Sequence, residues 1–186
     1  MATHSRESIP AVGWKVTKAT LVSVFLCILL NISFAVLTTV TGNIGIINLV
    51  FDILLTLVII YAPMCDHGNA DANLCSFGYL KPDYKRGFII GLFSLIPFYV
   101  ITFPLLIMKI VGSVSFFGYL KLYRVICSPF MIVYLNLCPD TSIGAVSYID
   151  ILIMFLMPFI FVIACGIFYI FGLKRITISD KLVYKK

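Results

Sequence analysis

Long apolar segments alternate with short polar ones along the whole chain. Four segments are apolar over about 20 residues each, at positions 19–40, 44–63, 87–107 and 148–173. A helix needs about 20 apolar residues to cross the hydrocarbon core of a bilayer. Backbone amides in lipid must find partners within the segment, and the period-2 alternation of a membrane barrel is absent. The pattern predicts an all-α membrane protein, with one domain over residues 1–186 and four transmembrane helices.

The segment between the third and fourth apolar runs, residues 110–140, is less regular. Its apolar stretch after Arg124 has 13 residues, with Pro129 near the middle. That length suits a re-entrant or interfacial helical segment better than a span, although a fifth span is the alternative. At an outer interface, the aromatic side chains of this segment would lie near the lipid headgroups. They are Phe116, Phe117, Tyr119, Tyr123 and Tyr134.

Lysine and arginine flank the apolar segments rather than forming one basic face. With four spans, one side of the membrane receives 11 of the 14 basic residues, and the other receives only Lys109, Lys121 and Arg124. Cytoplasmic segments of membrane proteins are enriched in Lys and Arg. Both termini, with the tail 174–186, and the polar segment 64–86 are therefore predicted to be cytoplasmic. This distribution does not indicate nucleic-acid binding. With 61% hydrophobic and 12% charged residues, the composition also excludes a soluble domain.

The first two apolar segments each carry a narrow stripe of small and polar residues at steps of three and four, the spacing of one helix face. The first stripe holds Thr20, Ser23, Cys27, Asn31, Ala35, Thr38 and Gly42, and the second holds Gly45, Asn48, Asp52 and Thr56. Folding about the short turn at 41–43 pairs Cys27 with Thr56, Asn31 with Asp52, Ala35 with Asn48, and Thr38 with Gly45. The match predicts a close hairpin held by small side chains and interhelical hydrogen bonds.

Asp52 is the only acidic residue well inside an apolar segment. An ionised carboxylate there costs at least about 2.5–3.5 kcal/mol, so it needs a partner or a proton. Asn31 is the expected partner, and Asn31, Asn48 and Asp52 form a candidate intramembrane polar site. The site has two interpretations: an ion or proton site, or a hydrogen bond that clips the hairpin together. The second is favoured, because a transport path usually carries more than one charged residue.

The polar segment 64–86 is predicted to be a cytoplasmic loop between the second and third spans. Asn69, Asp71 and Asn73 are residue types that hydrogen-bond their own backbone in loops and so hold a fixed shape. Together with His67 they form a candidate recognition surface. A loop of fixed shape suggests recognition rather than catalysis.

Cys65, His67 and Cys75 raise the question of a zinc site in the same segment. Their C-x-H-x7-C spacing lacks the paired ligands of known zinc sites. The stretch 69–73 has the alternation of a calcium loop, but Leu74 and Leu80 stand where that loop needs Gly and Glu. We therefore expect no metal.

Gly87 and Gly91, followed by Ser94, form a stripe of small residues at the start of the third span. Such G-x-x-x-G patterns let two helices approach closely. The stripe marks either a dimer face or packing within the chain. Internal packing is the preferred interpretation in a chain with four spans.

The sequence contains no H-E-x-x-H, G-x-S-x-G or Walker motif and no paired catalytic carboxylates. We therefore expect a non-enzymatic integral membrane protein without a cofactor, acting as an accessory or interaction subunit of a membrane complex. The alternative is a small transporter or channel subunit that uses Asn31 and Asp52. The expected partners are the lipid bilayer and another membrane protein or a second copy of this chain.

Three stretches carry a resemblance: DHGNADANLCSFGYLKPDYKRGFIIGLFSLIPF at 66–98, LYRVICSPFM at 122–131, and FGLKRITISDKLVYKK at 171–186. The order of these elements is similar to that in small multispan membrane proteins of Gram-positive bacteria. The resemblance covers residues 64–186 and brings no activity with it. It implies a bacterial plasma membrane and a cytoplasmic position for the segment 64–86.

Overall fold

The computed structural model describes residues 6–41, 45–111, 119–137 and 146–176. Every regular element within these residues is a helix. In chain order they are α1 (Ile9–Thr41), α2 (Gly45–Ser76), α3 (Arg86–Gly91), η1 (Leu92–Leu95), α4 (Ile96–Val111), α5 (Tyr119–Ile126), η2 (Ser128–Phe130), α6 (Met131–Leu137), α7 (Tyr148–Leu156) and α8 (Phe159–Leu173).

Four helical segments are long and apolar enough to cross a membrane. The first two are α1 and α2. The third runs through α3, η1 and α4 as Arg86–Val111, and the fourth joins α7 and α8 as Tyr148–Leu173. The break in the fourth lies beside Pro158, whose ring and missing N–H interrupt the helical hydrogen bonds. The predicted all-α membrane fold with four spans is confirmed.

The predicted helical segment between the third and fourth spans is also present. Tyr119–Ile126 and Ser128–Leu137 form a pair bent by 93°, which would raise the number of spans to five if the pair were one broken span. The pair packs into the bundle, and its apex at Ser128 is buried. The expectation that Tyr123 and Tyr134 lie near headgroups is wrong. Both are fully buried, and the Tyr134 hydroxyl donates to the carbonyl of Met154 at 3.2 Å.

Two boundaries differ from those predicted. The first helix begins at Ile9, ten residues before the expected span, and the second continues to Ser76. Residues 64–76, predicted as part of a loop, are therefore helical. The cause is tertiary: Met64, Gly68 and Asp71 continue the buried stripe of α2, so this face packs against other helices instead of meeting water.

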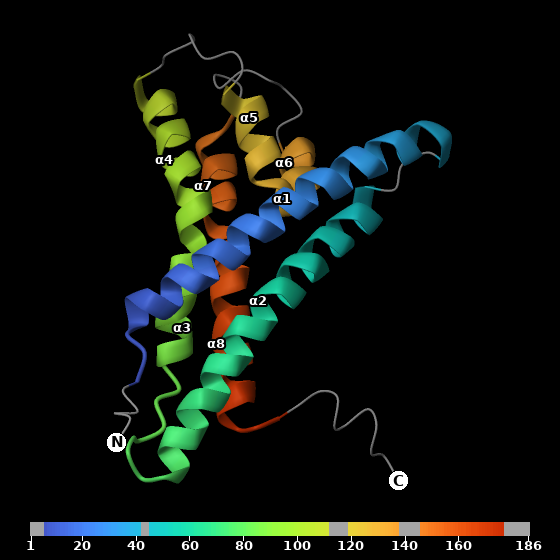
Figure 1. The fold of residues 1–186 in the computed structure, drawn as a ribbon. Coiled ribbons are helices and arrows are strands. Elements are labelled where there is room, and N and C mark those ends of the chain that lie inside the picture. The colour runs from blue at the N-terminus through green and yellow to red at the C-terminus, as the bar shows by residue number, and fades with distance from the viewer. Residues whose placement is uncertain (1–5, 42–44, 112–118, 138–145, 177–186) are drawn as a thin grey trace.

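The helices gather at the end of the molecule where α1 and α3 begin and α2 and α8 end, which we call the basal end (Figure 1). There α8 lies between α2 and α3. At the opposite end, α5 and α6 lie between the α1–α2 hairpin and the helices α4 and α7 (Figure 1). Both ends of the described chain, at Arg6 and Ile176, thus lie on the same side of the bundle, as an even number of spans requires.

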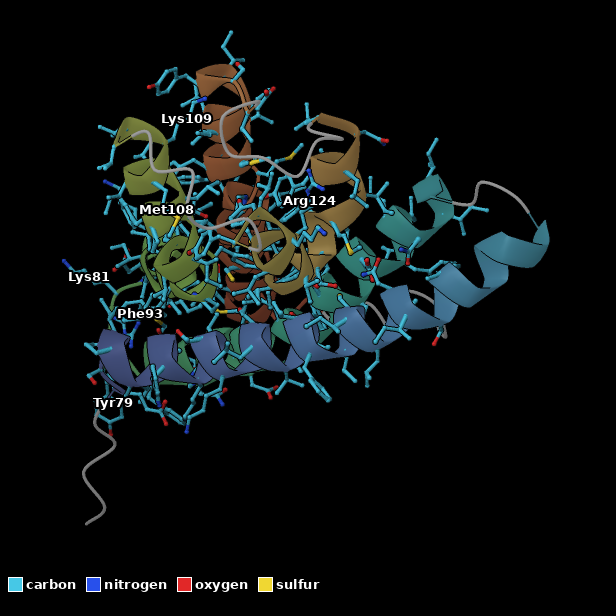
Figure 2. All side chains as sticks on the ribbon, turned by 90° about the horizontal axis from the view of Figure 1, so that it is seen from above. Tyr79, Lys81, Phe93, Met108, Lys109 and Arg124 are labelled. Atoms are coloured by element: carbon cyan, nitrogen blue, oxygen red, sulfur yellow. The ribbon has the colours of Figure 1, made fainter. Side chains whose placement is uncertain are left out.

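Glycines allow the close packing at the basal end. A Cβ atom at Gly172 of α8 would lie 2.1 Å from the carbonyl oxygen of Cys65, and one at Gly68 of α2 would lie 2.3 Å from that of Tyr169. A Cβ atom at Gly87 would lie 2.6 Å from the Cβ of Tyr169. Figure 2 shows Phe93 beside the first turns of α1, where its ring fills the space that a side chain at Gly13 would need.

The G-x-x-x-G stripe of the third span serves internal packing. Gly87 and Gly91 are buried, and a Cβ at Gly91 would lie 2.9 Å from the Cβ of Cys165 in α8. The stripe therefore faces the fourth span within the same chain. This confirms the preferred interpretation over a dimer face.

Candidate functional site

The first candidate site lies where α1, α2 and η2 meet. The polar stripe of α1 is buried at Thr20, Ser23, Cys27 and Asn31, and that of α2 is buried at Asn48, Asp52 and Thr56. Two predicted pairs are in contact: the Cys27 sulfur lies 3.6 Å from Thr56 Oγ1, and Asn31 Nδ2 donates to Asp52 Oδ2 at 2.8 Å. These contacts confirm the predicted register of the hairpin. The side chain of Thr38 lies outside the described residues.

Asn31 is the centre of this site. Its Nδ2 lies 2.8 Å from three acceptors: the carbonyl oxygen of Cys27, Asp52 Oδ2, and Ser128 Oγ of η2. Its Oδ1 accepts from Asn48 Nδ2 at 2.6 Å. One amide thus joins α1, α2 and η2, which fits the interpretation of the site as a clip.

Two buried oxygens of this network lack a hydrogen-bond donor among the described residues. Asp52 is 1% exposed and Asn48 4% exposed, yet no donor among the described residues reaches Asp52 Oδ1 or Asn48 Oδ1. Buried polar atoms nearly always have a hydrogen-bond partner. A cavity of about 250 Å³ touches the network from the side of Asn31 and Ser128. Its other lining residues are Ile28, Ile32, Ala35, Val125 and Met131.

The second candidate site lies at the basal end and is built around Asp71 of α2. Its Oδ2 accepts from Arg6 Nη2 at 2.7 Å and Nε at 3.1 Å, and from the hydroxyl of Tyr169. Arg86 Nη1 lies 3.4 Å from the same oxygen. One carboxylate therefore ties the N-terminal segment, α2, α3 and α8 together. We call Arg6, Asp71, Arg86 and Tyr169 the basal clasp.

A cavity of about 460 Å³ opens beside the basal clasp. One part of its wall is polar and charged, and the other is apolar. The polar part consists of Arg6, Glu7, Asp66, His67, Asp71, Asn73 and Arg86, and the apolar part of Val12, Ala70, Leu74, Phe77 and Ile90. Arg86 is 4% exposed, and its Nε has no acceptor among the described residues.

The structure brings three of the four candidate recognition residues together. His67, Asp71 and Asn73 all line the basal cavity, whereas Asn69 points to the sulfur of Cys65, 3.9 Å from its Nδ2. The prediction that Asn69, Asp71 and Asn73 cap their own loop is wrong, because they lie in a helix whose backbone is already bonded. Asp71 holds the clasp instead, and Asn73 Oδ1 accepts from Arg175 at 2.8 Å.

Cys65 and Cys75 do not come together. They are separated by ten residues on one helix, a rise of about 15 Å, which is too far apart for one metal ion to bind both. Over the parts of the chain that the structure describes, three His, Cys, Asp or Glu side chains are nowhere grouped as metal ligands.

The charged groups around the basal clasp shift one another's pKa values. Desolvation by burial lowers the pKa of Arg6, but the hydrogen bond and charge of Asp71 outweigh it and raise this pKa above its ordinary value. The hydrogen bond from Lys15 Nζ, 2.9 Å from Glu7 Oε2, lowers the pKa of the Glu7 carboxyl. Glu7 Oε2 also lies 3.6 Å from His67 Nδ1. Arg6 and Glu7 are therefore both held in their charged forms.

Sequence reasoning missed the residues that come from distant elements. Ser128 joins the Asn31 network across 97 positions, and Arg6 reaches Asp71 across 65. Ser128 had a weak signal, as a polar residue next to Pro129 in an apolar stretch. Arg6 had none, since it stands in a polar N-terminal segment.

Comparison of the chain with protein-family models, with curated proteins and with solved structures finds no match.

Proposed function

We propose that the protein is a non-enzymatic interaction subunit of a membrane complex and that the basal cavity receives a segment of a partner membrane protein. The observation that carries this proposal is that His67, Asp71 and Asn73 line one cavity together with an apolar wall. Ligand sites commonly combine such a wall with a few placed polar groups. A cavity of this size accommodates one or two side chains of a protein segment.

The residues that line the basal cavity indicate what kind of partner segment would bind there. Among the described residues no acceptor reaches the Nε of buried Arg86, which favours a carboxylate or a backbone carbonyl on the incoming segment. Phe77 is 73% exposed at the cavity and offers an apolar contact. The proposed partner segment thus presents an acidic side chain or a chain terminus next to an apolar residue.

A non-enzymatic role is supported by the way in which the charged groups are engaged. Asp71 Oδ2 accepts from Arg6 and Tyr169 and lies within ion-pair distance of Arg86, and Glu7 is paired with Lys15. A general base needs a lone pair directed at a substrate. Asp71 Oδ2 is instead occupied by cations and a hydroxyl, as in a structural clasp.

We infer that the basal end faces the cytoplasm of a bacterial cell and that the membrane is the plasma membrane. In the sequence, the N-terminal segment, the segment 64–86 and the tail from 174 together carry 11 of the 14 basic residues, and cytoplasmic segments are enriched in Lys and Arg. Figure 2 shows Lys81 at the edge of the molecule, where it can reach water, and Arg124 among the side chains of the interior. The resemblance to membrane proteins of Gram-positive bacteria supports the same assignment.

In-membrane photocrosslinking tests the partner. A photoreactive residue at Phe77 should join one partner chain in stoichiometric amount, whereas the same residue at Val58, 67% exposed on α2 and far from the cavity, should join only lipid. Asn73→Ala should weaken the partner crosslink by about fivefold or more, the effect of losing about 1 kcal/mol of binding. Asn69→Ala is the matched control on the same helix and should leave it unchanged. Equal crosslinking at both positions, or a clean monomer after gentle extraction, would contradict the proposal.

Cysteine labelling of intact cells tests the orientation. In a background whose accessible native cysteines are replaced by serine, Tyr148→Cys should react with a membrane-impermeant maleimide added outside. Lys81→Cys at the basal end should react only after the cells are opened. Both side chains are exposed, so a failure to react reports the membrane barrier and not burial. The reverse pattern would show that the basal end faces outward.

A further inference from the structure

The unpartnered oxygens of Asn48 and Asp52 are not explained by the interaction role. They lie one helical turn apart on the same face of α2, the spacing at which side chains are neighbours. Both belong to buried side chains, and each is an acceptor that lacks a donor among the described residues. Two neighbouring acceptors without a donor indicate a missing positive charge or hydrogen.

The orientation of the amides follows from their surroundings and leaves no better arrangement. Asn31 must direct its NH2 group toward the Cys27 carbonyl and Asp52 Oδ2, because its oxygen would be repelled by both. Its Oδ1 therefore faces Asn48, which must present its own NH2. Asn48 Oδ1 is then left as an acceptor, so turning either amide removes one bond without satisfying this oxygen.

We propose that Asp52 holds a proton on Oδ1 in the folded protein and donates it to Asn48 Oδ1. The single hydrogen satisfies both oxygens at once. It also removes the negative charge that would otherwise be buried in the membrane, where an ionised carboxylate is costly. The site is then an intramembrane proton-binding site with Asn31 Nδ2 fixed on the other carboxyl oxygen.

The groups around Asp52 fit a neutral carboxyl. From α1, the titratable neighbour is Cys27, whose sulfur lies 3.5 Å from the backbone oxygen of Asp52. From α2 the neighbour is Thr56, which donates to the same backbone oxygen at 2.9 Å. The bent helix pair between the third and fourth spans contributes Ser128, and Arg124 and Cys127 of the same segment are also buried. None of the ion pairs among the described residues includes Asp52. Asn31 and Ser128, which are part of the same network, line the adjacent cavity of about 250 Å³.

The pH dependence of stability tests this site in purified protein in micelles. If the folded state binds a proton that the unfolded state has released, stability falls as pH rises, by up to tenfold in the folded-to-unfolded ratio per pH unit. Asp52→Asn replaces the hydroxyl by an NH2 that can donate to Asn48 Oδ1. This variant should fold, and the part of the pH dependence that the Asp52 proton causes should disappear. Asp83→Asn, an exposed carboxylate in the basal segment, should keep the wild-type dependence.

Infrared spectra give a second measurement. Wild-type protein in lipid should show the carbonyl stretch of a protonated carboxylic acid, and this band should be missing in Asp52→Asn. Asn48→Ala removes the acceptor and should shift the band without removing it. Three results would overturn the proposal: an Asp52→Asn variant that does not fold, an unchanged pH dependence in that variant, or stabilisation of wild type by Na⁺ or K⁺ at constant pH. The last would show that the oxygens bind a metal cation instead.

Discussion

Asp71→Asn is expected to lower the free energy of unfolding by about 3–5 kcal/mol, the cost of breaking a buried ion pair by removing one partner. The substitution keeps the size of the side chain but removes the charge that Arg6 and Arg86 share. Arg86 is buried, so its charge would be left without compensation. Unfolding by denaturant in micelles, followed by circular dichroism, measures the change.

Two variants make this prediction specific. Glu7→Gln removes the carboxylate of the exposed pair with Lys15 and should change stability by no more than about 1 kcal/mol. Adding Arg86→Met to Asp71→Asn removes the uncompensated charge and should recover part of the loss, since groups in one network are not additive. An Asp71→Asn protein as stable as wild type would show that the clasp does not hold the basal end together.

Gly172→Ala is expected to destabilise the protein by about 3 kcal/mol or more, at the upper end of the range for overpacked sites. The new methyl group would lie 2.1 Å from the carbonyl oxygen of Cys65, so the backbones of α2 and α8 must separate. Gly68→Ala should act in the same way from the other helix, at 2.3 Å from the Tyr169 carbonyl. Thermal unfolding and retention of the folded species on size-exclusion chromatography report the effect.

The sign of this result is informative because alanine favours a helix over glycine by about 1 kcal/mol. If close packing did not matter, both variants would be more stable than wild type. Gly166→Ala is the graded control: the methyl group would meet the ring of Phe88, a side chain that can turn away, so the loss should be smaller. Gly78→Asn should be tolerated, since its φ of 76° suits Asn and nothing lies within 4 Å.

The α1–α2 hairpin was predictable in detail from the sequence. Its polar residues stand out on apolar helices, and a short turn leaves one way to pair the two stripes. Asn31 and Asp52 therefore meet as expected. The same pattern extends along α2 beyond the predicted span. The buried residues at steps of four and three are Asn48, Asp52, Thr56, Ile60, Met64, Gly68 and Asp71. Following that period past Pro63 would have predicted the helical segment to Ser76.

The basal clasp and the buried bend at Ser128 were not predictable from local pattern. A polar run such as 64–76 has the composition of a loop until distant residues cover it. Here Arg6 and Arg86 neutralise Asp71, and Gly172 of α8 leaves room for α2 to pack closely against it. The burial of Tyr123 has the same origin. Amphipathic aromatic residues suit both an interface and a core, and only the packing partner, Thr102 at 3.5 Å from its hydroxyl, decides between them.

The lengths of α1 and α2 have a consequence for the surrounding bilayer. With 33 residues, α1 is about 50 Å long, whereas the hydrocarbon core is about 30 Å thick. Figure 1 shows the hairpin running obliquely to α4, α7 and α8. Because the hairpin diverges from the other helices, we expect the protein to take up more area in one leaflet than in the other. Such a shape is expected to prefer curved regions of the membrane over flat ones.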